Sequence, residues 1–308
     1  MMTVIPLVLL GIAAAEEQQR HIFPGPAPIP SRGCGKALSV PVGAPLNMIL
    51  PVPEDEMLFN KFREYYLFLP KAWNNTEPLP LTVSFHGFYD EAIDLEKTDK
   101  LMAMSIQTGG SFIAVHPQGM MDTGTRTPQV PYPQRTWNCG GTVRAQPHSG
   151  SYTGPTCITA NRTDVWGDYP CYLTCQMHGG CKDTCYSSTC ANDVLFTQKL
   201  LDHLEDNYCI DRRRIHASGM SNGGMMAYQA GVSFSSRFAS MVPVAGSALL
   251  GFWTPPKTPI ALMDIHGTMD EVSHCQNPYT RTSVRMGAAA DLILRYHCLA
   301  DDPSKPLE

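Results

Sequence analysis

Residues 214–226 decide the fold, and they read RIHASGMSNGGMM. Residues 214–218 are typical of a buried strand, and a helix is expected from Gly223 onward. Between them lies Gly219-Met220-Ser221-Asn222-Gly223, a G-x-S-x-G sequence in the strand, turn and helix context that this motif requires. Glycines let the chain turn sharply at the serine, so the Ser221 hydroxyl is expected at the carboxyl edge of a sheet. Ser221 is therefore the predicted nucleophile, and an ordinary Gly-rich helix start is the alternative.

Short apolar runs rich in β-formers alternate with helix-compatible segments on both sides of this motif. Strands are expected at Glu64–Leu69, Leu81–Phe85, Phe112–His116, Arg214–Ser218, Met241–Ala245 and Ile260–Ile265. Helices are expected at Ala191–Asn207, Gly223–Val232 and Thr282–Cys298. Because the strands are apolar on both faces, the pattern predicts an α/β protein with a mostly parallel sheet and helices on both faces.

The composition is that of one large globular domain, with 308 residues, 43% hydrophobic and 17% charged. The formal net charge is -5, and the chain has no basic run interleaved with aromatic residues. Nucleic-acid binding rests on clustered Lys and Arg, so no nucleic-acid partner is expected.

The N-terminus is predicted to be a signal peptide, residues 1–15, with an apolar run followed by Ala13-Ala14-Ala15. A buried N-terminal strand is the alternative. The run is shorter than the roughly 20 apolar residues that span a bilayer, so no membrane partner is expected. Residues 16–33 are rich in Pro, Gly and Gln and predict an extended arm.

Eleven cysteines behind such a leader favour disulfides in a secreted, extracellular protein. The N-x-T sequons at Asn74 and Asn161 are compatible with export as a glycoprotein. The odd count leaves one cysteine without a partner in this chain.

A disulfide-stapled surface insertion is predicted for residues 139–190, which contain few aliphatic side chains. Seven cysteines lie there: Cys139, Cys157, Cys171, Cys175, Cys181, Cys185 and Cys190. The alternative is a zinc module, because the pairs at 171/175 and 181/185 flank His178.

Two backbone amides are expected to form the oxyanion hole. One belongs to Asn222, which follows the nucleophile. The other is that of Phe88, in the loop after the strand Leu81–Phe85, with Tyr89 as the alternative. We expect His86 to shape this turn rather than to transfer protons, because the base in such enzymes follows the acid in chain order.

Asp270 is the predicted acid, because it follows the strand Ile260–Ile265, and Asp264 inside that strand is the alternative. A histidine base should come next. Only His274 and His297 follow Asp270, and neither is well placed. We therefore expect the base, a last strand and the missing cysteine partner to lie beyond Glu308.

Several motifs together resemble the secreted carboxylesterases that include feruloyl esterases, acetylxylan esterases and poly(3-hydroxybutyrate) depolymerases. The matching stretches are Ser31–Lys36, His86-Gly87, His116–Gly119, Thr136–Asn138, Asn207–Asp211, Ala217–Met226, Pro243–Gly246 and His266–Asp270. The resemblance implies an α/β-hydrolase esterase domain over residues 34–308. It also implies serine catalysis with Ser221 as nucleophile and Asp270 as acid, without a metal or another cofactor.

The expected function is hydrolysis of feruloyl or acetyl esters on plant-wall polysaccharide by a monomer. Hydrolysis of polyhydroxybutyrate is the alternative within the same class. A different class also stays open, a non-catalytic relative that lacks the base and binds polysaccharide through aromatic residues such as Tyr169 and Tyr172.

Overall fold

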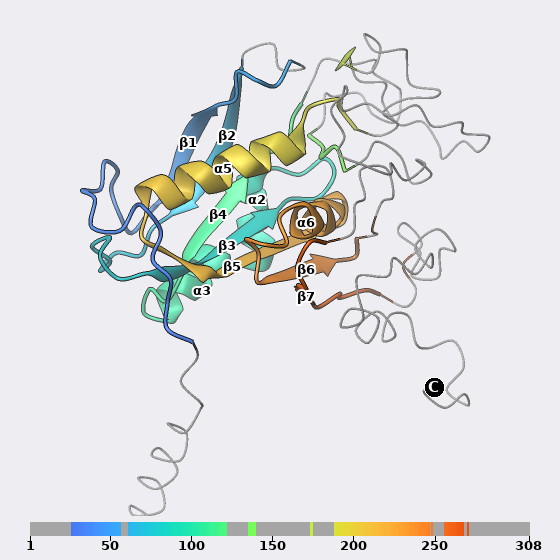
Figure 1. Cartoon of the computed structure of the whole chain (residues 1–308). Coiled ribbons are helices and arrows are strands. Elements are labelled where there is room, and N and C mark those ends of the chain that lie inside the picture. Colours follow the sequence, from blue (N-terminus) through green and yellow to red (C-terminus); the bar gives the residue numbers. More distant parts are fainter. Residues whose placement is uncertain are drawn as a thin grey trace, which may run out of the picture.

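The computed structural model describes residues 26–56, 61–121, 135–139, 173–174, 188–246, 248, 256–267 and 270. Its sheet contains β1 (Pro45–Pro51), β2 (Phe62–Phe68), β3 (Leu79–Phe85), β4 (Ile113–Pro117), β5 (Ile210–Met220), β6 (Ser240–Val244) and β7 (Ala261–Leu262). The strands lie in the order β1-β2-β4-β3-β5-β6-β7 (Figure 1). Strand β2 runs antiparallel to both its neighbours, and the remaining pairs are parallel. The predicted mostly parallel sheet is confirmed.

All six expected strands are present, and β1 is the strand that the sequence did not predict. It begins at Pro45 and ends at Pro51, and along most of it exposed residues alternate with half-buried ones. Proline is tolerated here because β1 pairs only with β2 and forms the sheet edge. Its weak apolar signal is therefore that of an edge strand.

Helices cover both faces of the sheet (Figure 1). Helices α5 (Asp193–Asn207) and α6 (Asn222–Ser233) were both expected from the sequence, and they lie together on one face. Helices α2 (Ala92–Asp99) and α3 (Leu101–Gln107) pack against β4 on the other face and were not predicted. Lys100 separates them with a φ of 52°, which interrupts a helix. The expected helix Thr282–Cys298 lies outside the described residues.

Successive residues of β4 point to opposite faces and thereby divide the core. Ile113 and Val115 pack in the main cluster with α5 and α6. Ala114 packs in a smaller cluster with Met102 of α3 and Phe68 of β2. Strands buried on both faces explain why the sequence reads as continuous apolar runs rather than as alternating ones.

The N-terminal segment is fastened to the start of β5. A disulfide joins Cys34 to Cys209, and Pro30 forms a bridge with Asp211. The side chain of Asn75 lies between these segments, where it donates to the carbonyls of Gly33, Lys36 and Asn207 and accepts from the Cys209 amide.

Cys190 is also disulfide-bonded, whereas Cys139 is a buried free thiol. The other cysteines of the predicted insertion lie outside the described residues, as do the proposed signal peptide and His178. The division of the chain into leader, arm, domain and insertion therefore stays a prediction.

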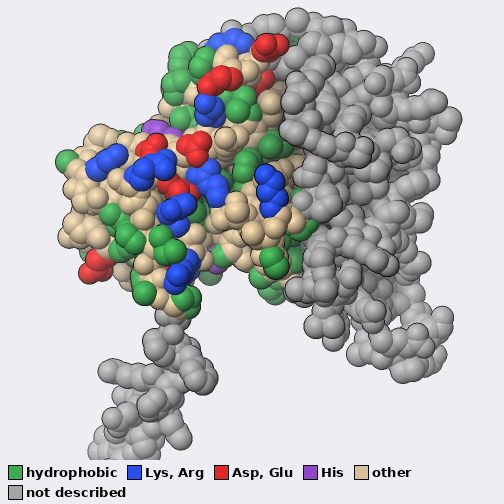
Figure 2. Space-filling view, viewed as in Figure 1, with side chains coloured by type: hydrophobic (Ala, Val, Ile, Leu, Met, Phe, Trp, Pro, Cys, Tyr) green, Lys and Arg blue, Asp and Glu red, His purple; other side chains and the backbone are tan. Residues whose placement is uncertain are grey.

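The face shown in Figure 2 carries Lys and Arg interspersed with Asp and Glu. Ion pairs among the described residues include Arg32 with Asp206, Lys199 with Glu54 and Arg237 with Asp202. Within the described residues, no helix is both long enough and apolar enough to cross a bilayer.

Candidate active site

Ser221 lies at a sharp bend between β5 and α6. Its φ of 54° and ψ of -119° are rare for a residue with a side chain. The Ser221 amide donates to the carbonyl of Val244 in β6 (2.8 Å), and the residue is half-buried. The predicted strand, turn and helix are therefore present, with the serine at the carboxyl end of β5.

The glycines around Ser221 are required because three backbones meet there. A Cβ added to Gly219 would lie 2.3 Å from the carbonyl oxygen of Gly223. A Cβ added to Gly223 would lie 2.0 Å from the carbonyl oxygen of Phe85. Both contacts are with backbone atoms that cannot move aside, so β3, β5 and α6 pack this closely only with glycine at these positions.

The loop after β3 lies beside the bend, as the sequence predicted. A Cβ added to Gly87 would be 3.8 Å from the Ser221 Cβ. The loop therefore runs in contact with Ser221, at the place where the sequence predicted the second oxyanion donor.

Both ring nitrogens of His86 are bound by backbone groups. Nε2 accepts from the amide of Gly119 (2.9 Å), so the proton is on Nδ1, which contacts the Gly87 carbonyl (2.7 Å). Burial lowers the pKa of this imidazole to about 4. A neutral ring with both nitrogens engaged agrees with the predicted structural role.

The two candidates for the loop donor differ in their contacts. Tyr89 has a φ of 70°, and its amide donates to the carbonyl of Arg135 (3.1 Å). This bond occupies the amide of Tyr89, the alternative donor, and the assignment of Phe88 stays a prediction. The second predicted oxyanion donor is the backbone amide of Asn222. Because Asn222 is the first residue of α6, this amide has no acceptor within the helix.

The stretch Thr136–Asn138 contributes to the family resemblance, but the sequence assigned it no role in the site. The Asn222 Oδ1 accepts from the Trp137 amide (2.7 Å) and the Thr136 hydroxyl (3.2 Å), while Nδ2 donates to the Trp137 carbonyl (3.2 Å). The Trp137 indole donates to the His86 carbonyl (2.9 Å). The Trp-Asn pair in this loop was the feature of the sequence that could have drawn attention to the segment. It does not reveal which distant residues the two side chains contact.

The region of the predicted acid lies two strands from Ser221 in the sheet. The carbonyl of Ile265 accepts from the amide of Ala245, directly after β6. Asp270 has an oxygen 3.3 Å from Nε2 of His266, whose Nδ1 lies 3.8 Å from Asp264. The structure therefore brings both candidate acids to one histidine. The candidate bases His274 and His297 lie outside the described residues.

Asp264 has a second partner, the phenol of Tyr228 in α6, which donates to it. Burial and this neighbouring carboxylate raise the pKa of Tyr228 well above its usual value. A largely buried carboxylate that fastens the last described strand to α6 has a structural role, so Asp270 stays the preferred acid.

Glu96, Asp99 and His116 form the group of possible metal ligands within the described residues. Their interactions have a simpler explanation. Glu96 accepts from the amides of Met102 and Ala103 at the start of α3, and Asp99 contacts His116 (3.1 Å). Glu96 therefore caps the start of α3, and the Asp99 carboxylate is paired with His116. The cysteines of the alternative zinc module lie outside the described residues.

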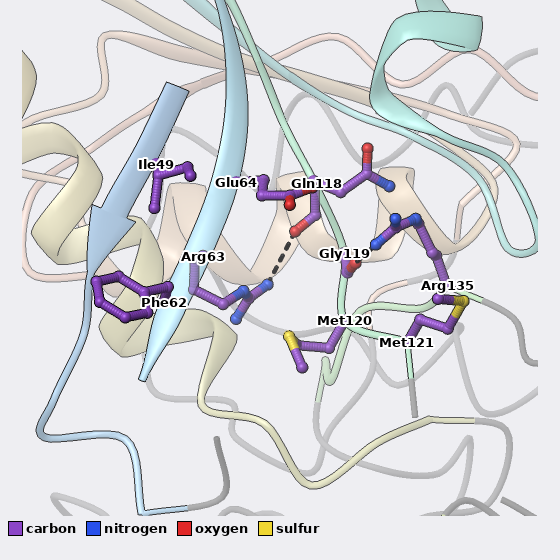
Figure 3. A pocket seen from close by; sticks show the side chains of 9 residues that line it. All are labelled: Ile49, Phe62, Arg63, Glu64, Gln118, Gly119, Met120, Met121 and Arg135. Carbon is purple, nitrogen blue, oxygen red and sulfur yellow. Dashed lines mark hydrogen bonds between the residues drawn. The ribbon is translucent and has the colours of Figure 1, made fainter. Parts of the chain in front are cut away.

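A hollow of about 430 Å³ opens at the carboxyl end of β4, the same edge of the sheet as Ser221 (Figure 3). Its lining includes Ile49, Phe62, Arg63, Glu64, Gln118, Gly119, Met120, Met121 and Arg135. Arg135 links it to the donor loop, through its contact with Tyr89. The hollow combines apolar and charged side chains, and its lining residue Arg135 is hydrogen-bonded to Tyr89, the neighbour of Phe88.

The strand order, the serine at a positive-φ bend and the adjoining loop after β3 define an α/β-hydrolase fold. No family model matches the chain. It is 30% identical over 84 residues to a bifunctional acetylxylan esterase/xylanase, XynS20E, from Neocallimastix patriciarum. It is 32% identical over 88 residues to feruloyl esterase B from Piromyces equi and 30% identical over 87 residues to feruloyl esterase C from Emericella nidulans.

These alignments cover 27–28% of this chain and 12%, 16% and 32% of the relatives, respectively. The chain thus matches at most a third of the length of these curated relatives. The resemblance inferred from the motifs is confirmed for feruloyl and acetylxylan esterases at the level of sequence similarity.

Solved structures similar to this chain include a ferulic acid esterase from Anaeromyces mucronatus in complex with ferulic acid. It is 13% identical, with 80% of each chain covered and a TM-score of 0.44. A thermostable esterase is 18% identical, with 77% of this chain and 50% of that chain covered and a TM-score of 0.43. The fold assignment rests on the strand order and the bend at Ser221.

Proposed function

We propose that this protein is a secreted serine carboxylesterase that hydrolyses polymer-linked esters through an acyl-enzyme on Ser221. The observation that carries the proposal is the positive-φ bend at Ser221, with glycine backbones packed around it and the His86–Phe88 loop alongside. A structure that only linked a strand to a helix would not need this strained conformation.

In the proposed reaction, the Ser221 oxygen attacks the ester carbonyl carbon while a histidine downstream of Asp270 takes the hydroxyl proton. The amides of Phe88 and Asn222 donate to the oxyanion. The alcohol leaves with that proton, and water then attacks the acyl-enzyme and releases the carboxylic acid. Asp270 orients the histidine and stabilises its charged form. Every step is acid–base and nucleophilic chemistry, and no metal or cofactor is assigned to it.

Feruloyl and acetyl esters of plant-wall polysaccharide are the proposed substrates. Support comes from the similarity to two feruloyl esterases and an acetylxylan esterase. The hollow beside the donor loop adds apolar side chains together with Arg135 and Glu64, which suit a substrate with an acyl group and a sugar. Polyhydroxybutyrate is the second substrate class.

Secretion as a monomer is part of the proposal. Disulfides at Cys34–Cys209 and at Cys190 are typical of proteins that mature in an oxidising compartment. The sequon residue Asn74 is exposed, as an attached glycan requires.

The test compares the full-length protein with Ser221→Ala on p-nitrophenyl acetate, methyl ferulate and acetylated xylan. We expect the substitution to lower kcat by about 10⁴-fold or more, because the nucleophile is lost. Ser233→Ala, at the other end of α6, is the matched control and should retain full activity. Equal rates for wild type and Ser221→Ala would refute serine catalysis, and polysaccharide binding without turnover would favour the non-catalytic class.

A further inference from the structure

We infer that the segment Arg135–Asn138, here called the bracket, sets the spacing between the two oxyanion donors, with Trp137 as its central positioning residue. The inference rests on the proposed function and extends it to residues that do not touch the substrate. It follows from hydrogen bonds that run from this one segment to both donor loops.

On the helix side, the bracket holds Asn222 by its side chain. The amide and carbonyl of Trp137 both bond to the Asn222 carboxamide, at 2.7 and 3.2 Å, and the Thr136 hydroxyl adds a third bond. The backbone amide of Asn222, in the first turn of α6, has no acceptor within the helix and is the proposed oxyanion donor. The bracket thus fixes the side chain of one proposed donor residue.

On the strand side, the bracket holds His86 and Tyr89, which flank Gly87 and Phe88. The Trp137 indole donates to the carbonyl of His86 (2.9 Å). The carbonyl of Arg135 accepts from the amide of Tyr89 (3.1 Å). With both flanks attached to the same segment, the Phe88 peptide cannot rotate or move away from Ser221 unless the bracket moves too.

A buried ion pair anchors the bracket from behind. The amide of Asn138 donates to Asp193 Oδ2 (2.6 Å), whose Oδ1 bonds to Arg63 (2.6 Å), and both ionic side chains have no exposed surface. Asn138 Nδ2 also donates to the Ala191 carbonyl (3.1 Å). Buried ion pairs contribute little net stability, so their value here is to fix one arrangement of the chain.

This fixation has a direct chemical consequence. A donor stabilises the tetrahedral intermediate only when its nitrogen is about 2.7–3.1 Å from the developing oxyanion. Losing one donor completely typically lowers kcat by about 10²- to 10³-fold. Displacing a donor by loosening the bracket should therefore lower kcat by a smaller factor and leave substrate binding nearly unchanged.

The test uses Trp137→Phe, which removes the indole donor but keeps an aromatic ring in the core. We expect kcat to fall about 10- to 100-fold with KM changed less than twofold, since a loosened oxyanion donor acts on the transition state. Inactivation by a p-nitrophenyl phosphonate, in which serine attack at phosphorus displaces p-nitrophenolate, should slow by a similar factor. Amide hydrogen exchange of residues 86–90 should become faster.

Trp73→Phe is the matched control, because the Trp73 indole also donates to a carbonyl, that of Glu77 (2.8 Å). This control should leave kcat and the exchange of residues 86–90 unchanged. Asn222→Ala, which retains the backbone amide, is the second variant if Trp137→Phe fails to fold, and it should show the same split between kcat and KM.

Unchanged kcat and unchanged exchange in a folded Trp137→Phe or Asn222→Ala would overturn the inference. A tenfold rise in KM at constant kcat would also overturn it. Ser221→Ala separates this failure from that of the proposed function. If that variant is inactive while Trp137→Phe is fully active, the serine chemistry stands and only the role of the bracket is lost.

Discussion

His86 illustrates how single residues around Ser221 are determined by their surroundings. Chain order made it an unsuitable base, and the structure gives it a different role: it connects the donor loop to Gly119, directly after β4. Its ring is fully buried and neutral, because Nε2 must remain free of a proton to accept from the Gly119 amide. Protonation of this side chain would break the bond that shapes the loop.

The buried imidazole should make the protein less stable in mild acid. The unfolded chain binds a proton near pH 6.5, whereas the folded one binds it only near pH 4. Lowering the pH through this window favours the unfolded state, so stability present above pH 6.5 is progressively lost. The loss attributable to His86 is about 3 kcal/mol at most.

Urea unfolding at pH 7 and pH 5 measures this effect. His86→Asn should show a smaller difference between the two pH values than wild type does. Burial also lowers the pKa values of His203 and His216. These two residues will therefore contribute to the pH dependence of the unfolding free energy in both proteins. An identical pH dependence in the variant would contradict the assignment to His86.

At the scale of elements, an ion pair joins β2 to the start of α5. Neither segment, taken alone, indicates that its charged residue has a partner in the other. Arg63 in β2 and Asp193 at the first turn of α5 are 130 residues apart and form an ion pair with no exposed surface. The guanidinium carbon also lies 4.0 Å from the centre of the Phe196 ring. Burial raises the pKa of Asp193 despite this partner, so the carboxylate depends on Arg63 to stay charged.

Arg63→Met should destabilise the protein by about 3–5 kcal/mol, because it leaves Asp193 buried without its cation. The double variant Arg63→Met with Asp193→Asn should recover much of this loss, since the amide still offers an oxygen to Asn138. Chemical denaturation of the single and double variants gives the comparison. A double variant less stable than Arg63→Met would show that the loss does not come from an unpaired charge.

At the scale of the whole molecule, one cross-link joins distant parts of the chain. The Cys34–Cys209 disulfide spans a sequence separation of 175 residues and ties the N-terminal segment to the start of β5. Around it, Ser31 donates to the Tyr208 carbonyl and the Gly33 amide donates to Glu205. A cross-link that closes so long a loop restricts the unfolded chain strongly.

Replacing both Cys34 and Cys209 by serine should lower the free energy of unfolding by about 2–5 kcal/mol. The measurement is the denaturation midpoint of the variant and of wild type under non-reducing conditions. Cys139→Ala, which removes a buried free thiol, serves as the control and should cost less. A midpoint equal to that of wild type would show that hydrogen bonds alone hold the N-terminal segment.

Much of this architecture was contained in local sequence. Strands β3 and β4 are largely buried along their length, and the glycines at 219 and 223 indicate a bend that excludes side chains. Apolar runs and the motif were therefore enough to predict the mostly parallel sheet and the bend at Ser221. Strand β1 was not predicted, because an edge strand needs little apolar surface and tolerates proline.

The contacts across the site were decided by tertiary structure alone. Trp137 lies 85 residues from Asn222 and 51 from His86, and Asp193 lies 130 from Arg63. A hydrogen bond leaves no periodic trace in sequence, because its energy depends on which distant group folding brings within 3 Å. The sequence by itself therefore determined the layers of sheet and helix and the candidate nucleophile. Only the packing of these elements against one another decided which contacts hold the donor loops in place.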